Sequence, residues 1–294
     1  MKVSVLIPTY HNPDKVKRCI NSLVHQIRIP EEVIIVFDSE DVETKSVIST
    51  FQNLLNIIPV PLKKMGKMTK ILNAGIKQTS GEIIAFLDED VSCDKEWLSR
   101  ITSEFKDGDV VACGGKDVII CHGKKVLSRE TNEIGILKWK GYIVGNQYRG
   151  AKKREVMFLK GCNMAVKRKY LHKLNENLIG FVRWEQDIFF KLLETKKKII
   201  YDPEIKVYHF KDNREYLKPS WTYWYGHNTV YLFMKYLKGM KRCLAILFYF
   251  LIGDSSSPGY FRFVFYVVNR NENSFCSFAT SQIAKIKGLF TFLR

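Results

Sequence analysis

Three consecutive acids follow an apolar run near residue 88 and are the side chains best placed to do chemistry. The segment 83–87, Ile-Ile-Ala-Phe-Leu, leads directly into Asp88, Glu89 and Asp90. This pattern is typical of a buried parallel strand that ends at a crevice. Adjacent carboxylates repel one another, so they either hold a cation or stand in solvent. Magnesium and manganese prefer oxygen ligands and are often shared with phosphates. The segment predicts a metal site that holds a diphosphate, with a solvated loop as the alternative.

The elements that would position these acids alternate between strand and helix. Strands are predicted at 3–7, 32–37, 56–60 and 82–87, and helices at 13–25, 41–51 and 67–79. This alternation indicates βαβ units and an α/β fold with a doubly wound, mainly parallel sheet. Ligands bind such sheets beyond the carboxyl ends of the strands. We therefore expect Thr9, Asp38 and the acids 88–90 to converge in one crevice.

The second half of the chain gives weaker signals. A further strand is predicted at 109–114, followed by an irregular excursion over 115–155. Regular structure is expected again at 156–166. A helix from Arg168, a second helix through 188–193, and short strands at 198–201 and 205–208 complete the predicted core.

Composition limits the class of protein. The chain has 294 residues, 46% of them hydrophobic and 26% charged, as in an ordinary globular protein. Seven cysteines without a C-x-x-C pair predict free thiols in a reducing compartment and no structural zinc site. Met1 and Lys2 precede a strand directly, so we expect no signal peptide. No apolar run reaches the ~20 residues that span a bilayer.

Positive charge and aromatic residues concentrate towards the C-terminus. The net charge is +17, and residues 213–294 hold eleven Lys or Arg against three acids. Sixteen aromatic residues lie between Tyr216 and Tyr266, several of them near lysines. This pattern predicts helices that lie in an anionic membrane interface, or else a helical lid whose aromatics pack on the sheet. We expect a core domain at 1–212 and this basic, aromatic-rich helical extension at 213–294.

Six segments taken together resemble the family 2 glycosyltransferases. They are 3–12, 33–41, 66–75, 81–90, 159–165 (Leu-Lys-Gly-Cys-Asn-Met-Ala) and the region from Trp184 to His209. The resemblance implies the Rossmann-like GT-A fold. It also implies inverting transfer of a sugar from a nucleotide-diphosphate sugar to a glycan or lipid-linked acceptor. The segment at 66–75 departs from the family pattern by one extra residue before Leu72.

The resemblance also implies roles for individual residues. Contacts to the nucleotide sugar are expected from Pro8, Thr9, Tyr10, Asp38, Lys67, Asn73, Asp88 and Glu89. A divalent metal, Mn²⁺ or Mg²⁺, would be held by Asp90, Asp88 and His209. Simpler interpretations remain for three of these: a helix N-cap for Asp38, a solvated lysine for Lys67 and a structural histidine for His209.

The catalytic base has two candidates. Inverting transfer needs a group that takes the proton of the acceptor hydroxyl. The family usually places an Asp there, and the alignment puts Glu185 at that position, with Asp187 as the rival. The two do not share a helix face, so only one should reach the site. Acceptor contacts are expected from Lys160, Gly161, Asn163, Arg183 and Trp184, although Trp184 equally suits the core.

Other functions fit parts of the sequence. A metal-dependent nucleotidyltransferase would normally have an early glycine-rich loop, and 8–13 contains no glycine. A basic nucleic-acid-binding module would leave the acids 88–90 unexplained. An inactive homologue is also compatible with Glu185. The favoured interpretation has no nucleic-acid partner and places the protein at the cytoplasmic face of the membrane, peripheral or monotopic.

Overall fold

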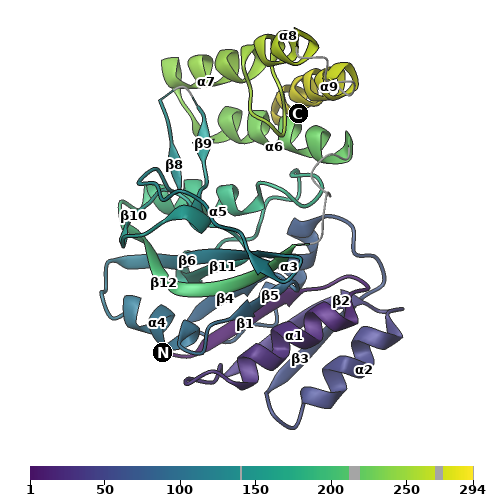
Figure 1. Cartoon of the computed structure of the whole chain (residues 1–294), viewed down its shortest axis with the longest axis vertical. Helices are drawn as coiled ribbons and strands as arrows, with labels where there is room; N and C mark the ends of the chain where they lie inside the picture. Colours follow the sequence, from purple (N-terminus) through teal and green to yellow (C-terminus); the bar gives the residue numbers. More distant parts are fainter. Residues whose placement is uncertain (140, 212–218, 269–273, 294) are drawn as a thin grey trace.

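The computed structural model describes residues 1–139, 141–211, 219–268 and 274–293. A large mixed sheet forms its centre, with helices on both faces, and further helices stack at one end of the molecule (Figure 1). The strands of the large sheet follow the order β10-β12-β6-β11-β4-β1-β2-β3, with β5 paired to β12 and β7 to β6. The predicted α/β class and doubly wound sheet are confirmed.

Four short strands form the parallel part of the sheet that the sequence predicts. They are β1 (Val3–Pro8), β2 (Glu32–Asp38), β3 (Ile57–Leu62) and β4 (Ile83–Leu87). The helices between them are α1 (Pro13–Val24), α2 (Val42–Phe51) and α3 (Met68–Ile76). β1, β2 and β4 are buried on both faces, which explains their continuous apolar runs.

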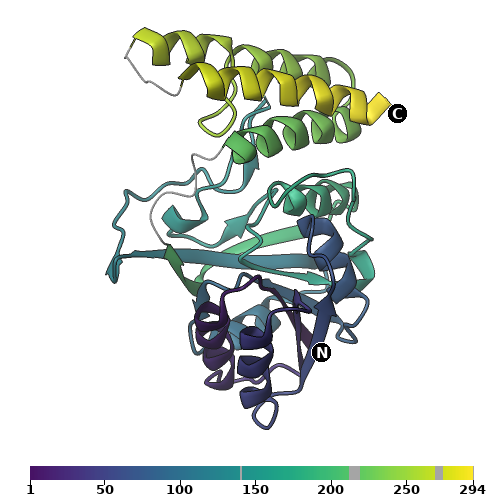
Figure 2. The ribbon, with the colours of Figure 1, turned by 90° about the vertical axis from the view of Figure 1, so that its right-hand side faces the viewer.

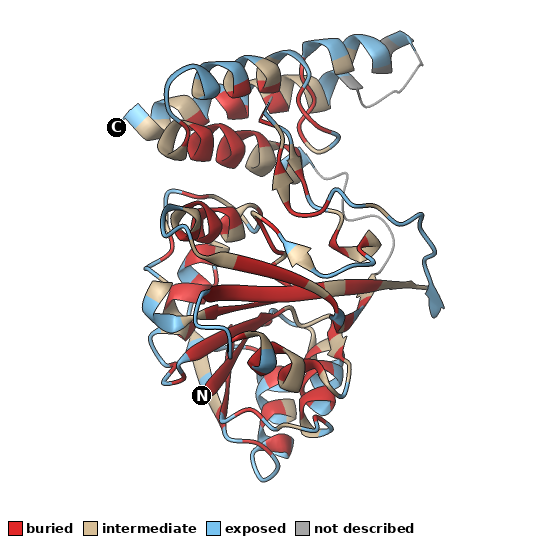
Figure 3. Cartoon of the chain, turned by 90° about the vertical axis from the view of Figure 1, so that its left-hand side faces the viewer, coloured by how far each residue is buried: buried red, intermediate tan, exposed pale blue. Residues whose placement is uncertain are grey.

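Alternate side chains of each strand supply two separate hydrophobic clusters. Val5 and Ile7 face α1, α2 and α4 (Trp97–Glu104), whereas Leu6 faces α3 and α5 (Trp184–Glu194). This alternation follows from the two-residue period of a strand. The buried strands therefore form a layer between two layers of helices (Figure 3). Side chains at the strand ends are held at the edge of a rigid sheet.

The second half of the sheet is mixed. β11 (Asn163–Lys167) runs antiparallel to both β4 and β6 (Val110–Cys121). β12 (Lys198–Lys211) runs parallel to β6 along most of its length. The smaller elements are β5 (Val91–Cys93), β7 (Lys124–Lys125), β8 (Ile136–Leu137), β9 (Ile143–Val144), β10 (Arg154–Glu155), η1 (Gln147–Arg149) and η2 (Arg168–Tyr170).

Several boundaries differ from those that the sequence predicts. β6 extends seven residues into the region expected to be irregular, and α4 was not predicted. The helix expected from Arg168 is a single 3₁₀ turn, because it has no buried side chain to anchor it. The two short strands expected after residue 198 are one strand, with a register irregularity between Asp202 and Lys206.

The C-terminal residues form helices that stack beyond the sheet (Figure 2). They are α6 (Pro219–Tyr236), α7 (Gly239–Leu251), α8 (Tyr260–Val268) and α9 (Ser274–Leu293). Leu232, Phe233 and Tyr249 belong to the same hydrophobic cluster as Phe86 and Phe189 of the α/β part. The two domains expected at 1–212 and 213–294 therefore share one core. The seven cysteines, all within the described residues, form no disulfide bond with one another.

Candidate active site

The carboxyl ends of β1, β2 and β4 meet at one edge of the sheet. Pro8 of β1 pairs with Val36 of β2, and the next amide, that of Thr9, donates to the Val36 carbonyl at 2.9 Å. Asp38 is the last residue of β2, and Asp88 follows β4 directly. The expected convergence of polar strand ends is thus present in the backbone.

Asp88, Asp90 and His209 form a cluster at this edge, with one ligand atom of each within 4.8 Å of the others. His209 Nε2 lies 3.2 Å from Asp90 Oδ2. Two backbone contacts bring β12 to the acids: His209 pairs with Val91 of β5, and the Phe210 amide donates to the Asp90 carbonyl at 2.9 Å. β12 therefore holds His209 beside the two aspartates, although they are far apart in the sequence.

The two aspartates have different proton affinities. Burial, reinforced by the charge of Asp90, raises the pKa of Asp88 to about 7. Burial alone would raise the pKa of Asp90, but the hydrogen bond and charge of His209, together with the charges of Lys15 and Lys211, hold it below its ordinary value. Asp90 is therefore the carboxylate that stays charged most readily.

The donor set fits a divalent cation. Asp90 Oδ1 is buried and has no hydrogen-bond partner among the residues that the structure describes. Such an atom is costly unless a ligand or ion satisfies it. Two carboxylates and an imidazole suit Mn²⁺ well and Mg²⁺ through the oxygens. The residues predicted to bind metal thus have side chains that fit such an ion.

Glu89 faces the loop after β1. Its carboxylate accepts from the Tyr10 amide at 3.0 Å and from Asn12 Nδ2 at 2.6 Å. These bonds tie the loop at 10–12 to the acidic turn after β4. Tyr10 is 56% exposed. Glu89 positions the loop predicted to contact the nucleotide.

Asp38 is half-buried and does not cap a helix. Its Oδ1 accepts from the Glu40 amide at 3.0 Å, and its Oδ2 lies 3.6 Å from His11 Nε2. The cap of α2 is Asp41, whose Oδ1 accepts from the Thr44 amide at 2.9 Å. Asp38 is consequently available at the strand end for a ligand that donates hydrogen bonds, such as a nucleoside.

Lys67 and Asn73 both contact the segment that leads to α5. Lys67 Nζ donates to the Glu176 carbonyl at 3.0 Å. Asn73 exchanges two hydrogen bonds with the backbone of Leu174, at 3.0 and 2.8 Å. In this structure they pin the 174–176 segment to α3.

Lys160 and Asp117 lie next to the cluster of Asp88, Asp90 and His209. The Asp117 carboxylate is buried, forms an ion pair with Lys160 and approaches His209 Nδ1 at 3.9 Å. The Lys160 charge also opposes the rise in the pKa of Asp88. Asp117 was not predicted, because β6 was expected to end at residue 114. The sequence signal that could have identified Asp117 is a single acid within the apolar run of β6.

Three residues predicted to contact the acceptor instead pack in the core. The Trp184 ring is buried against Phe86, with ring centroids 5.7 Å apart. A Cβ on Gly161 would collide with that ring, so Gly161 makes room for it. Asn163 is buried and accepts from Trp97 Nε1 at 2.8 Å. In the structure all three residues contact other parts of the protein interior.

The two candidate bases have different surroundings. Glu185 lies in the first turn of α5, and burial raises its pKa. Its charge also acts on Asp88, so the two carboxyls share one neighbourhood. Asp187 is buried against α6, where it accepts from Lys235 Nζ at 2.9 Å and from the Tyr236 hydroxyl at 2.6 Å. Glu185 thus combines a raised pKa with proximity to the acids.

Arg183 is tied to the C-terminal helices. It caps α5 in the left-handed region, with φ of 64°, and forms an ion pair with Asp254 at 3.1 Å. Its guanidinium also lies 5.1 Å from the centre of the Tyr225 ring. Both partners belong to residues beyond 213, so the start of α5 is held by the C-terminal region.

The sheet order and the acidic strand end define the GT-A architecture, which solved structures share. The structure of TarS residues 1–349 from S. aureus in complex with UDP-GlcNAc aligns with a TM-score of 0.65 at 18% identity, over 100% of this chain and 81% of that one. GalNAc-T7 with UDP, GalNAc and Mn²⁺ aligns with a TM-score of 0.63 at 14% identity, over 98% and 53%. These likenesses confirm the fold.

Sequence comparison identifies the family. Residues 4–174, more than half of the chain, match the model of glycosyl transferase family 2, and the chain belongs to that family. The amylovoran biosynthesis glycosyltransferase AmsE of Erwinia amylovora is 33% identical over 131 residues, which are 43% of this chain and 49% of AmsE. The chain spans about half or less of the length of such curated relatives. The predicted family is confirmed.

Proposed function

We propose that this protein transfers a sugar from a UDP-sugar to a hydroxyl of a glycan or lipid-linked acceptor, with inversion at the anomeric carbon. The observation that supports the proposal is that Asp90, Lys160 and Glu185 all lie close enough to Asp88 for their charges to act on its pKa. Donor-binding acids and a candidate base with a raised pKa lie together at the strand ends. Family membership favours this function over a nucleotidyltransferase or a nucleic-acid-binding module.

Each group has a task in the reaction. Asp38 accepts hydrogen bonds from the nucleoside, and Glu89 fixes the loop beside it. Asp90, Asp88 and His209 would hold a divalent ion, which when bound offsets the negative charge of the departing diphosphate. Glu185 takes the proton from the acceptor hydroxyl as the new bond forms. Burial raises the pKa of Glu185, which makes it a stronger base than an ordinary carboxylate.

The experiment is a panel of UDP-sugars assayed with Mn²⁺ for UDP release. UDP-GlcNAc comes first because the solved TarS structure contains it. Asp90→Ala should abolish release, and so should a chelator, because both remove the cation from the diphosphate. Glu43→Ala, which removes an exposed acid on α2, is the matched control and should retain activity. Turnover that survives both Asp90→Ala and the chelator would refute the proposal.

We also propose that α7–α9 bind the cytoplasmic face of an anionic membrane, where a lipid-linked acceptor would be found. Large apolar side chains are exposed on these helices, among them Leu247 (55%), Phe265 (64%) and Phe290 (60%). Lys238 and Lys241 are exposed beside them, where they would meet anionic headgroups. No helix in the described part of the chain combines the length and apolarity needed to cross a bilayer.

Flotation with phosphatidylserine vesicles tests this second proposal. Substituting Phe265 and Phe290 by Ser should reduce binding at least severalfold, because both side chains would leave the lipid. Ile27→Ser removes an equally exposed apolar side chain at the other end of the fold and should not change binding. Point variants are preferable to deleting residues 213–294, which contribute to the core. Equal binding of all variants would contradict the proposal.

A further inference from the structure

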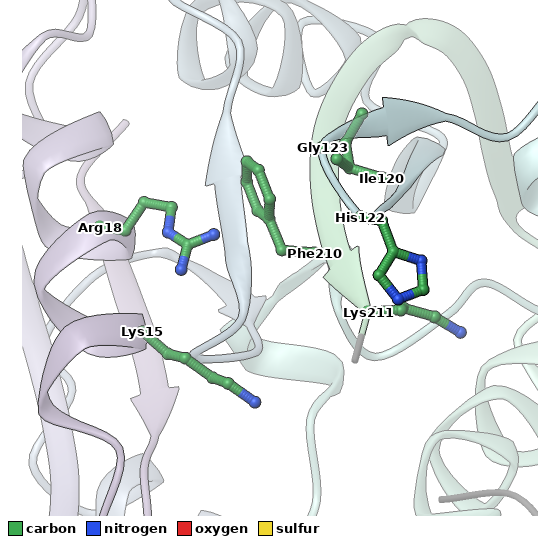
Figure 4. Close-up of a pocket in the computed structure, with 7 residues that line it drawn as sticks. All are labelled: Lys15, Arg18, Ile120, His122, Gly123, Phe210 and Lys211. Carbon is green, nitrogen blue, oxygen red and sulfur yellow. The ribbon is translucent and has the colours of Figure 1, made fainter. Parts of the chain in front are cut away.

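A basic cavity adjoins the candidate active site. It has a volume of about 390 Å³ and lies between α1, the end of β12 and the β6–β7 turn (Figure 4). This volume is within the range of small-ligand sites. The lining residues are Lys15 and Arg18 of α1, Phe210 and Lys211 of β12, and Ile120, His122 and Gly123 of the turn.

Positively charged side chains line this cavity. Three of its seven described lining residues are Lys or Arg, and none of these seven is acidic. Lys15 and Lys211 are near enough to Asp90 to contribute to the lowering of its pKa. The cavity is therefore positioned beside the metal-binding cluster, and its field favours an anion there.

Arg18 is oriented for planar recognition. Its guanidinium lies 4.2 Å from the centre of the Phe210 ring. Stacking of this kind holds the guanidinium in one orientation, which suits it to pair with two oxygens of a phosphate. Phe210 and Ile120 add apolar surface, against which the carbon skeleton of a sugar or polyol can pack. The combination suits a phosphate ester better than a bare inorganic ion.

The strand order separates this cavity from the expected nucleoside site. Asp38 ends β2, whereas two walls of the cavity come from β6 and β12, on the other side of β4, and the third is α1, which follows β1. A donor bound from Asp38 to the acids after β4 would leave the cavity for another substrate. We propose that the cavity binds a phosphate group of the acceptor, so that the acceptor is a phosphorylated saccharide or polyol. This inference rests on the proposed function, because it assigns the second substrate of the same site.

The test measures binding of glycerol 3-phosphate to the full-length protein presaturated with UDP and Mn²⁺. Calorimetry should show saturable binding of the phosphate ester and none of glycerol. The double variant Lys15→Gln/Arg18→Gln should bind at least tenfold more weakly. Lys17→Gln is the matched control, because Lys17 is exposed on α1 but does not line the cavity. It should bind as the wild type does.

Three results would overturn the inference. One is no binding of the phosphate ester. Another is an equal loss of affinity in Lys17→Gln, which would show a non-specific charge effect. The last is competition between UDP and the ester, with weaker UDP binding by the double variant, which would assign the cavity to the donor diphosphate. UDP affinity and UDP release by the wild type are measured first. A wild type that neither binds nor releases UDP would refute the proposed function, which is a different result from the three above.

Discussion

At the scale of single residues, the site depends on how burial and hydrogen bonding give neighbouring acids different pKa values. Asp88 and Asp90 are two residues apart, yet burial raises the pKa of one to about 7 while His209 lowers that of the other. Glu89, between them, is bonded to the loop after β1. This short acidic segment thus supplies the crevice with two carboxylates of different pKa. Its third acid, Glu89, holds the loop after β1 in place.

Glu185→Gln should remove sugar transfer and leave nucleotide binding intact. The amide keeps the size of the side chain but cannot take the acceptor proton, so kcat should fall by about 10²–10⁴. Transfer kinetics and UDP calorimetry together measure the two effects. Full activity in this variant would reassign the base, and Asp187→Asn would then be the variant to lose kcat.

The residues were more predictable than their contacts. The acids at 88–90, Asp38 and His209 were predicted from strand ends and from the family resemblance, and they lie at the edge expected. Asp117 was missed because its strand extends beyond the residue where the apolar alternation becomes ambiguous. The roles of Trp184, Gly161 and Asn163 depend on three-dimensional packing, which residue type and spacing do not encode.

At the scale of elements, α5 links the site to the C-terminal helices. Its first turn carries Glu185 towards the acids and Asp187 towards α6. The Asp187–Lys235 pair and the Arg183–Asp254 pair hold this turn from the other side. The orientation of the candidate base is therefore determined by helices that lie outside the family match at 4–174.

Asp187→Asn should destabilise the fold by about 2 kcal/mol, because it removes the charge that pairs with Lys235 and Tyr236. Chemical denaturation measures this loss. Glu194→Gln, which changes an exposed acid at the end of α5, is the control and should unfold as the wild type does. A double variant, Asp187→Asn/Lys235→Met, should lose less stability than the two single losses added together. Additive losses would show that the pair is not coupled.

Element boundaries were predicted best where both faces of a strand are buried. β1, β2 and β4 agree with their apolar runs to within one or two residues. β12 was divided in two because Asp202, Pro203 and Glu204 resemble a turn, whereas the structure accommodates them as a register irregularity. No element was predicted for the eight-residue α4, which follows the acidic turn after only a few residues.

At the scale of the whole molecule, the C-terminal helices are held together by buried polar groups. Lys285 of α9 is fully buried, and its Nζ donates to the carbonyls of Tyr249 and Pro258 at 2.8 and 2.9 Å. Burial lowers its pKa from the ordinary 10.5 to about 7. The helices α7 and α9 are joined by an amine that loses its charge near neutrality.

This amine makes the stability depend on pH. Between pH 7 and 10.5 the unfolded chain binds this proton and the folded chain does not. Lys285 therefore lowers the free energy of unfolding by its full amount below pH 7. This penalty shrinks as the pH rises across the window, by at most about 1.4 kcal/mol per pH unit, and it is gone above about pH 10.5. Lys285→Met should remove this part of the slope. The exposed Lys287→Met is the control, and equal slopes for all three proteins would contradict the prediction.

The two ion pairs that hold α5 have a consequence for how relatives of this protein can diverge. Arg183 and Asp187 have their partners, Asp254 and Lys235, in the C-terminal third of the chain. Recombination that exchanged only that third between relatives would separate each charge from its complement. Exchanges between relatives should therefore include α5 together with α6 and α7. Otherwise, both residues of each ion pair should be substituted together. Chimeras with a junction before residue 183 should fold, and those with a junction near 213 should not.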